Sequence, residues 1–215
     1  MGRRSIVVLS ILLLVAAITF TGCQAPPVGS AEWHFDRAHR LASAGHYHEA
    51  IAEYTEALNI NPNMAHAYVN RGAAFASNGQ YEQAIIDCTR AIEIDPDLTL
   101  AYNNRAAAYN NNGQHKLAAA DCNKAIQLDP NLASAYVNRA SAYHNMQQYS
   151  QAIADCDKSI KLDPGLAQAY LYRALAYKGQ GRKREAIADL IKFKNLTTDP
   201  QLDKMALDLI EELSE

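Results

Sequence analysis

The sequence predicts an all-α protein built as a tandem array of helix pairs, and three observations support this fold class. Similar residues recur every 34 positions, in five units that begin at residues 31, 65, 99, 133 and 167. Within a unit, apolar, aromatic or small residues occupy positions 4, 8 and 11 and again 20, 24 and 27, and each set falls on one face of a helix. Glycine at position 15 and proline at position 32, each in four of the five units, mark the turns.

Residues 1–22 have the character of an export signal and are set apart from the fold. Two arginines precede an almost entirely apolar run, residues 6–20, which is short for a membrane span of about 20 residues. The small residues before Cys23 resemble the bacterial lipoprotein signal, in which the cysteine is acylated and becomes the new N-terminus. This resemblance implies lipidation at Cys23. An uncleaved anchor and an ordinary secretory signal are the alternatives.

Residues 23–30 are therefore expected to be the lipidated cysteine and a short tether rich in Pro, Gly and Ser. The seven residues after Cys23 reach only about 20 Å, which keeps the folded part close to the bilayer. Acyl chains would hold the protein on a membrane effectively permanently, at the outer membrane or the external face of the plasma membrane. Loss of Arg3 and Arg4 with the signal changes the formal net charge from −3 to −5. This acidic balance disfavours a nucleic-acid partner.

The five units are read in order as a first helix, a turn at position 15 and a second helix that ends before position 32. Small residues at positions 8 and 20, such as Ala106 and Ala118, allow the two helices to approach closely. The units span residues 31–64, 65–98, 99–132, 133–166 and 167–198.

Residues 199–215 form one more amphipathic segment after the fifth unit. An array needs a capping helix because its last unit would otherwise expose the face on which units stack. The fifth unit is basic and this tail is acidic, so charge pairing between the two is expected. The alternative is that residues 178–184 contact lipid headgroups or an acidic partner.

The period and pattern resemble the tetratricopeptide repeat (TPR), and the resemblance covers residues 31–198. It implies a right-handed superhelical α-solenoid of five TPR units, each a helix-turn-helix, with residues 199–215 as the C-terminal capping helix.

Three cysteines share position 24, on the inward face of the second helix: Cys88, Cys122 and Cys156. In an exported chain a cysteine is a candidate for a disulfide, a metal site or a nucleophile. A first helix separates each successive pair, and packed helix axes lie about 8–10 Å apart, whereas a disulfide needs Cα atoms within about 7 Å. These cysteines are expected to be free, buried and inert.

An arginine at position 7 and an acid at position 23 occur in all five units. Antiparallel helices bring these positions together, so a repeated salt bridge between the helices is favoured over a catalytic array. The pairs are Arg37 with Glu53, Arg71 with Asp87, Arg105 with Asp121, Arg139 with Asp155, and Arg173 with Asp189.

Four histidines cluster early in the chain: His34, His39, His46 and His48. They lack the convergent spacing of a metal site, and solvated polar residues explain them better. No catalytic triad order, phosphate-binding glycine loop or paired-carboxylate pocket is found. The sequence therefore predicts no metal, no cofactor and no enzyme.

Position 6 carries the strongest candidates for binding. Two residues along a helix turn the side chain by about 200°, so position 6 points away from the packing face that holds position 8. In TPR arrays that opposite face lines the concave groove. An Asn amide both donates and accepts, so it can pair with either side of a peptide backbone whatever its sequence. The predicted peptide-binding residues are Asn70, Asn104, Asn138, His66, Asn111 and Asn145.

This pattern resembles the asparagine ladder in the TPR segment of the sugar transferase that glycosylates Ser/Thr. This resemblance implies that the groove binds an extended segment of a partner protein. The lipoprotein-like signal and the TPR array together resemble bacterial TPR lipoproteins, which implies a membrane-anchored scaffold for protein–protein interaction in bacterial envelope assembly. One alternative is that the asparagines only keep an exposed face soluble. Another is a structural module that self-associates as a dimer, without a peptide ligand.

Overall fold

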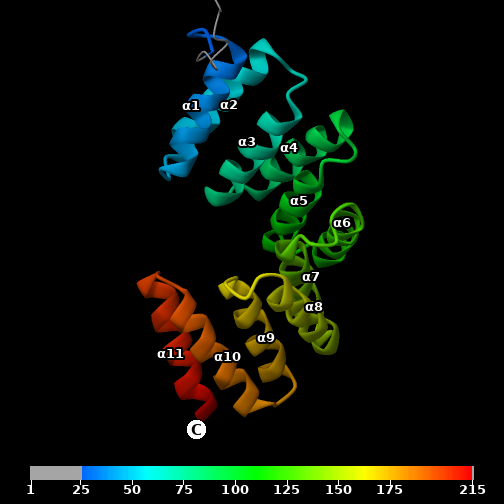
Figure 1. The fold of residues 1–215 in the computed structure, drawn as a ribbon, viewed down its shortest axis with the longest axis vertical. Coiled ribbons are helices and arrows are strands. Elements are labelled where there is room, and N and C mark those ends of the chain that lie inside the picture. Colours follow the sequence, from blue (N-terminus) through cyan, green and yellow to red (C-terminus); the bar gives the residue numbers. More distant parts are fainter. Residues whose placement is uncertain (1–25, 215) are drawn as a thin grey trace, which may run out of the picture.

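The structure is a computed structural model that describes residues 26–214, and the predicted signal, Cys23 and part of the tether lie outside these residues. Over the described residues it forms eleven α-helices and no strand (Figure 1). The helices are α1 (Ala31–Ser43), α2 (Tyr47–Ile60), α3 (Ala65–Ser77), α4 (Tyr81–Ile94), α5 (Thr99–Asn111), α6 (His115–Leu128), α7 (Ala133–Asn145), α8 (Tyr149–Leu162), α9 (Ala167–Gly179), α10 (Lys183–Leu196) and α11 (Pro200–Ser214).

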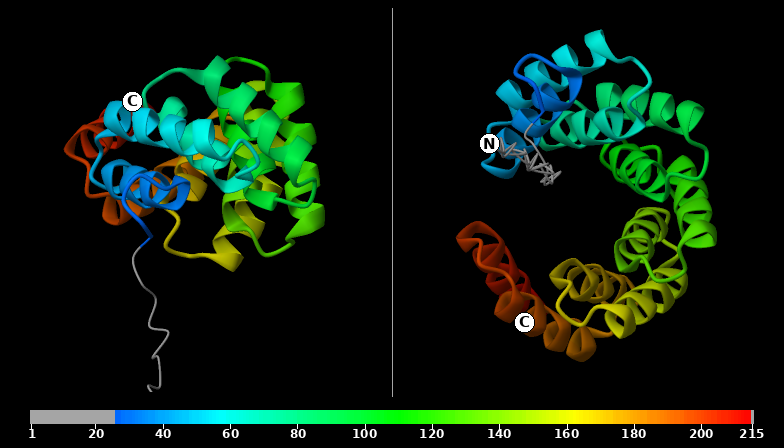
Figure 2. Two further views of the ribbon diagram at one scale, coloured as in Figure 1. Left: turned by 90° about the horizontal axis from the view of Figure 1, so that it is seen from above. Right: turned by 45° about the horizontal axis from the view of Figure 1, so that its top comes forward.

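The helices form consecutive pairs that follow one another along a curved array (Figure 2). Each odd-numbered helix from α1 to α9 packs along the even-numbered helix that follows it. From α1 to α9, each odd-numbered helix also contacts the odd-numbered helix before or after it, whereas within residues 26–214 the even-numbered helices make no comparable contact with each other. The first helix of every pair therefore lies on the inner side of the curve. The predicted all-α solenoid of five helix pairs and a final helix is confirmed.

Small side chains allow the two helices of each pair to pack closely. Ala106 and Ala118, at positions 8 and 20 of the third unit, are fully buried together with Cys122. In the second unit position 8 is Gly72, where a Cβ atom would stand only 3.1 Å from the sulfur of Cys88. Larger residues at position 8 would push the helices apart and leave voids beside them.

The turn inside each pair requires a left-handed backbone at position 15. Glycine fills this position in four units, with φ between 73° and 81°. In the fourth unit the residue is Gln147, with φ of 60°. A left-handed conformation is costly for a residue with a Cβ atom, so this turn is locally strained.

Replacing Gln147 by glycine should raise the free energy of unfolding by about 0.5–1 kcal/mol, because relief of the left-handed strain outweighs the entropy that glycine adds to the unfolded chain. The melting temperature should rise by about 2 °C. Gly113→Gln is the matched control, since a Cβ there would meet nothing within 4 Å and the cost is purely conformational. That variant should melt lower. Equal melting temperatures for Gln147→Gly and the natural chain would show that the turn is not strained.

Helix α11 covers the end of the array. Leu213 is buried against Ala174, Ala186 and Leu190 of the last pair. Two ion pairs join the basic fifth unit to the acidic helix: Lys178 with Glu212 at 2.7 Å, and Lys194 with Asp203 at 3.5 Å. The expected charge pairing between the last unit and its cap is therefore present. No helix in residues 26–214 has the length and hydropathy that crossing a membrane requires.

Candidate functional site

The six predicted binding residues lie on α3, α5 and α7, all on the inner side of the curve. His66, Asn111 and Asn145 are exposed. Asn70, Asn104 and Asn138 are half-buried rather than fully outward, because neighbouring inner helices pack against each other at this position.

Asn138 is part of a hydrogen-bond network that joins two units. Its Nδ2 donates to the Oδ1 of Asn103 at 2.9 Å and to the Asn103 carbonyl at 3.3 Å. In return, Asn110 Nδ2 donates to the carbonyl of Asn138 at 2.7 Å. The 34-residue pattern did not identify Asn103 and Asn110, at positions 5 and 12. Asn103 could have been recognised in the sequence as unusual, because position 5 is apolar in the other four units.

The amides of Asn111 and Asn145 are held by their own helices. Each Nδ2 donates to a backbone carbonyl four residues earlier, Asn111 to Ala107 at 3.0 Å and Asn145 to Ser141 at 2.9 Å. A carbonyl only accepts, so the nitrogen of each amide must face it. The amide oxygens are left to face solvent or a ligand.

Two hollows lie on the inner side, at equivalent places in the array. One, of about 230 Å³, lies between the first and second units and is lined by Tyr47, Tyr54 and Asn70 among others. The other, of about 300 Å³, lies between the third and fourth units. Its lining comes from four helices and consists of Ala107, Asn110, Asn111, His115, Asn138, Ser141, Asn145 and Tyr172.

Tyr54 forms the floor of the first hollow and is almost fully buried. Burial raises the pKa of its hydroxyl to about 12, and a hydrogen bond with the Asn70 side chain partly opposes that shift. The hydroxyl therefore stays protonated, as a neutral hydrogen-bonding group.

The salt bridges predicted between positions 7 and 23 are confirmed in all five units. In the third unit, Arg105 Nε and Nη2 donate to the two oxygens of Asp121 at 2.6 and 2.8 Å. The second and fourth units have the same two-pronged contact. In the first unit a single contact of 3.3 Å joins Arg37 to Glu53.

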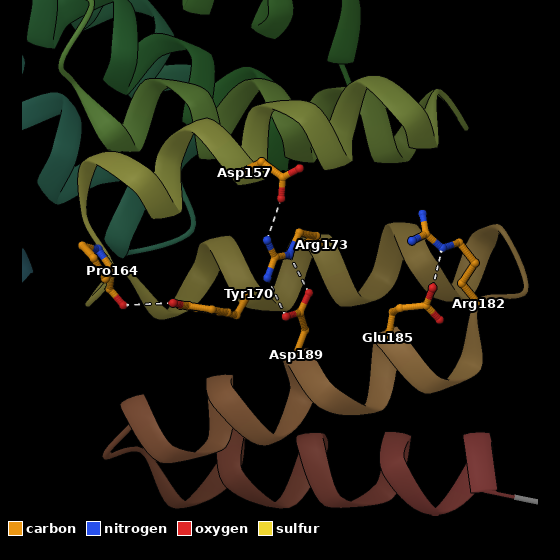
Figure 3. A network of polar contacts seen from close by, with 7 residues as sticks. All are labelled: Asp157, Pro164, Tyr170, Arg173, Arg182, Glu185 and Asp189. Atoms are coloured by element: carbon orange, nitrogen blue, oxygen red, sulfur yellow. Dashed lines mark hydrogen bonds and ion pairs between the residues drawn. The ribbon is translucent and has the colours of Figure 1, made fainter.

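Each later arginine also reaches back to the preceding unit, a contact that the sequence pattern did not indicate. Arg105 Nη1 donates to Thr89 Oγ1 at 3.0 Å, and Arg173 Nη1 donates to Asp157 at 2.6 Å. Figure 3 shows the fifth-unit example, with Arg173 between Asp157 and Asp189. The guanidinium therefore ties together three helices from two units.

These arginines are structural groups. Hydrogen bonding to Asp121 raises the pKa of Arg105, and the equivalent carboxylates raise the pKa values of Arg139 and Arg173. Aromatic rings at positions 4 and 11 also lie on either side, with Tyr102 and Tyr109 each within 6 Å of the Arg105 guanidinium. A guanidinium so held stays charged and fixed.

Cys88, Cys122 and Cys156 are free and buried in the structure, which confirms the prediction for them. Burial raises the pKa of the Cys88 and Cys122 thiols to about 12 and raises that of Cys156 as well. Because the thiolate is the reactive form, these thiols are inert near neutral pH.

The early histidines contact individual carboxylates. His34 Nδ1 lies 2.7 Å from Glu53, and His46 lies 3.6 Å from Glu49. Across residues 26–214, no three His, Cys, Asp or Glu side chains come together as a metal site requires. The contacts with Glu53 and Glu49 account for the positions of His34 and His46 without a metal ion.

Several solved structures share this fold. The MamA protein is 25% identical, with 77% of this chain and 91% of that chain covered and a TM-score of 0.63. YrrB, described as a TPR protein with an unusual peptide-binding site, is 21% identical, with 83% and 92% covered and a TM-score of 0.60. TTC0263, a thermophilic TPR protein from Thermus thermophilus, is 18% identical, with 84% and 98% covered and a TM-score of 0.74. No curated protein sequence matches this chain.

Family profiles match most of the array. The tetratricopeptide repeat profile matches residues 65–98, 99–132 and 133–166, which are the boundaries of the second, third and fourth units. Further TPR profiles match residues 38–79 and 168–196. Profile matches and solved structures therefore agree with the helix pairs, and the chain belongs to the tetratricopeptide repeat family, whose arrays are scaffolds for protein–protein interaction.

Proposed function

We propose that this protein is a membrane-anchored scaffold that binds an extended segment of another protein along the inner side of its array, in bacterial envelope assembly. The observation that carries the proposal is the row of inner-face amides at position 6, one on each of α3, α5 and α7. Asn70 and Asn138 also line the two hollows of that face.

The chemistry of the inner side supports a backbone ligand. The residues that line the two hollows include no Lys, Arg, Asp or Glu. A charged clamp for an acidic C-terminus is therefore absent from these hollows. Amide groups suit the alternating N–H and C=O groups of an extended peptide. The likeness to YrrB, whose structure is described as having an unusual peptide-binding site, supports a peptide ligand by analogy.

Selection from a displayed library of random linear peptides tests the proposal. The full-length chain, purified in detergent, should enrich peptides that bind it in solution. A variant with Asn70, Asn104 and Asn138 all replaced by alanine should not retain them. The control replaces three exposed amides of the outer helices, Gln83, Gln127 and Gln151, by alanine, and it should retain them. Peptides that bind the inner-face variant and the natural chain equally would refute the proposal.

The membrane anchor rests on Cys23, which lies outside the described residues. Cys23→Ser should leave the protein unlipidated, because the thiol is the proposed acyl acceptor. Metabolic labelling with a fatty acid should mark the natural chain and not the variant. The variant should also leave the membrane fraction if the signal is still cleaved. Labelling of the serine variant at the natural level would rule out lipidation at this site.

A second candidate function is self-association through the C-terminal end. The observation that favours it is the exposure of Leu202 and Leu207 on α11, beside a shallow hollow lined by Met205 and Leu209. Sedimentation over a range of concentrations separates the two functions. A monomer throughout the range favours the peptide groove, whereas a dimer abolished by Leu207→Lys favours self-association.

A further inference from the structure

The hollow between the third and fourth units is lined by a histidine where three other units have a tyrosine. Position 17 is tyrosine in the first, second and fourth units but His115 in the third. In the fourth unit the Tyr149 ring lies on the inner face, and a Cβ added to Gly179 would be only 2.5 Å from its Cζ. That glycine is at position 13 of the next unit. In the third unit the smaller His115 ring takes the place of that tyrosine beside Asn145, and this hollow, at about 300 Å³, is larger than the hollow of about 230 Å³ that Tyr47 lines.

The amide nitrogens around this hollow are engaged within the protein, so the amide oxygens are the atoms left for a ligand. Asn111, Asn138 and Asn145 each donate through Nδ2 to a backbone carbonyl, and a carbonyl can only accept. The hydrogen-bond network therefore determines which way each amide points. Among the described residues, no donor reaches the Oδ1 of these three amides.

His115 adds a fourth acceptor. Asn110 directs its Nδ2 to the Asn138 carbonyl, so its Oδ1 is the atom that meets His115 Nδ1 at 3.4 Å. That contact needs the imidazole proton on Nδ1, which makes Nε2 an acceptor while the ring is neutral. The hydroxyl groups of Ser141 and Tyr172 complete the lining and can donate.

This chemistry selects a class of side chain. A carboxylate would meet the amide oxygens with no cation to balance it. An ammonium or guanidinium group would find acceptors but no carboxylate, so its charge would stay uncompensated on desolvation. An apolar group would leave four acceptors unpaired. A primary carboxamide has two N–H groups for the acceptors and one oxygen for a hydroxyl.

We propose that this hollow is a specificity pocket for the carboxamide side chain of an Asn or Gln residue in the bound segment. The volume of about 300 Å³ is at the small end of ligand sites and suits one side chain rather than a cofactor. The inference rests on the proposed function and deepens it. Asn70 and Asn104 bind backbone of any sequence, whereas Asn138 also lines this pocket, which adds a requirement for one side chain.

The same display library tests the pocket. Peptides enriched by the full-length chain should share an Asn or Gln at one position. In a synthetic copy of an enriched peptide, changing that residue to Leu should weaken binding about thirtyfold, the effect of two neutral hydrogen bonds. Changing it to Glu or Lys should weaken binding at least as much.

Two variants of the protein connect that preference to the pocket. His115→Tyr restores the residue found in the first, second and fourth units and narrows the pocket, and the neighbouring pair Tyr81 and Asn111 shows that tyrosine is compatible with asparagine there. It should reduce the preference for Gln over Leu to less than threefold. Asn145→Asp places a carboxylate in the pocket and should make Lys preferred over Gln by about tenfold. Melting temperatures near that of the natural chain would confirm that both variants fold.

The possible failures are distinguishable. If enriched peptides need the position-6 asparagines but show no Asn or Gln preference, or keep that preference in His115→Tyr, the pocket inference is wrong and the proposed function stands. The variant with Asn70, Asn104 and Asn138 changed to alanine should lose peptides that the natural chain enriches. If it loses none of them, both the pocket inference and the proposed function are wrong.

Discussion

Replacing Arg105 by alanine should lower the free energy of unfolding by about 3–5 kcal/mol, the largest stability effect that we expect from one surface-accessible residue. Asp121 is only 8% exposed and would lose both of its guanidinium hydrogen bonds. Thr89 of the preceding unit would lose its contact as well. A buried carboxylate without a partner is costly because it has lost its hydration and gained nothing in return. Urea denaturation monitored by the helical circular dichroism signal measures the loss.

Arg37→Ala is the matched control at the same position of the first unit. Its side chain is 49% exposed, and a single contact of 3.3 Å joins it to Glu53. Removing such an exposed ion pair should cost less than about 1 kcal/mol. A second comparison changes Arg105 and Asp121 together to leucine, which removes the uncompensated charge and should recover most of the stability. If Arg105→Ala proves as mild as Arg37→Ala, the arginine fork, meaning the two-pronged contact of the position-7 arginine with its acid, does not stabilise the array.

The fork has a role in geometry as well as in stability. In the later units it holds the two helices of its own unit to the second helix of the unit before. It therefore constrains the rotation between units, which determines how the inner helices line up. Position 6 lies one residue before the arginine, so the spacing of the amide row depends on this tie. Stability and the binding surface are connected through the same side chain.

Much of the fold could be predicted from the repeat alone. A period of 34 with small residues at positions 8 and 20 predicts that the two helices of a unit pack closely where Ala106 and Ala118 are buried. The pairing of Arg105 with Asp121 also follows, since both belong to one helix pair. The contact from Arg105 to Thr89 did not follow, because it depends on the angle between units. Its partner position holds Thr, Thr, Asn and Asp in successive units, which obscures the pattern.

The candidate site could be predicted only in part. The helical period predicts that position 6 lies on the side away from the pair interface. It does not predict which residues of the next unit pack against that side. Contact between neighbouring inner helices half-buries Asn138 and gives it Asn103 as a partner. The size and the polar lining of the hollow at His115 reflect one departure from the repeated tyrosine, and they become clear only when the next unit is placed beside it.

Replacing Asn70, Asn104 and Asn138 together by alanine should weaken binding of an enriched peptide about a hundredfold. Each lost backbone contact removes on the order of 1 kcal/mol, and the losses add because the amides lie on separate units. The weakening should hold for peptides that differ everywhere except at the shared Asn or Gln, since Asn70 and Asn104 contact backbone. Fluorescence anisotropy of labelled peptides measures it.

Stability separates this effect from unfolding. Alanine favours a helix by several tenths of a kcal/mol over asparagine at each site, so sequence alone predicts that the melting temperature holds or rises slightly. The bond from Asn138 to the Asn103 oxygen at 2.9 Å changes that expectation, because its loss costs about 1 kcal/mol and cancels most of the gain. The triple variant should therefore melt within a few degrees of the natural chain while binding far more weakly. The outer-face control, with Gln83, Gln127 and Gln151 changed to alanine, should bind at full strength. If the triple variant binds as tightly as that control, the inner amides do not hold a peptide and self-association becomes the better account of this array.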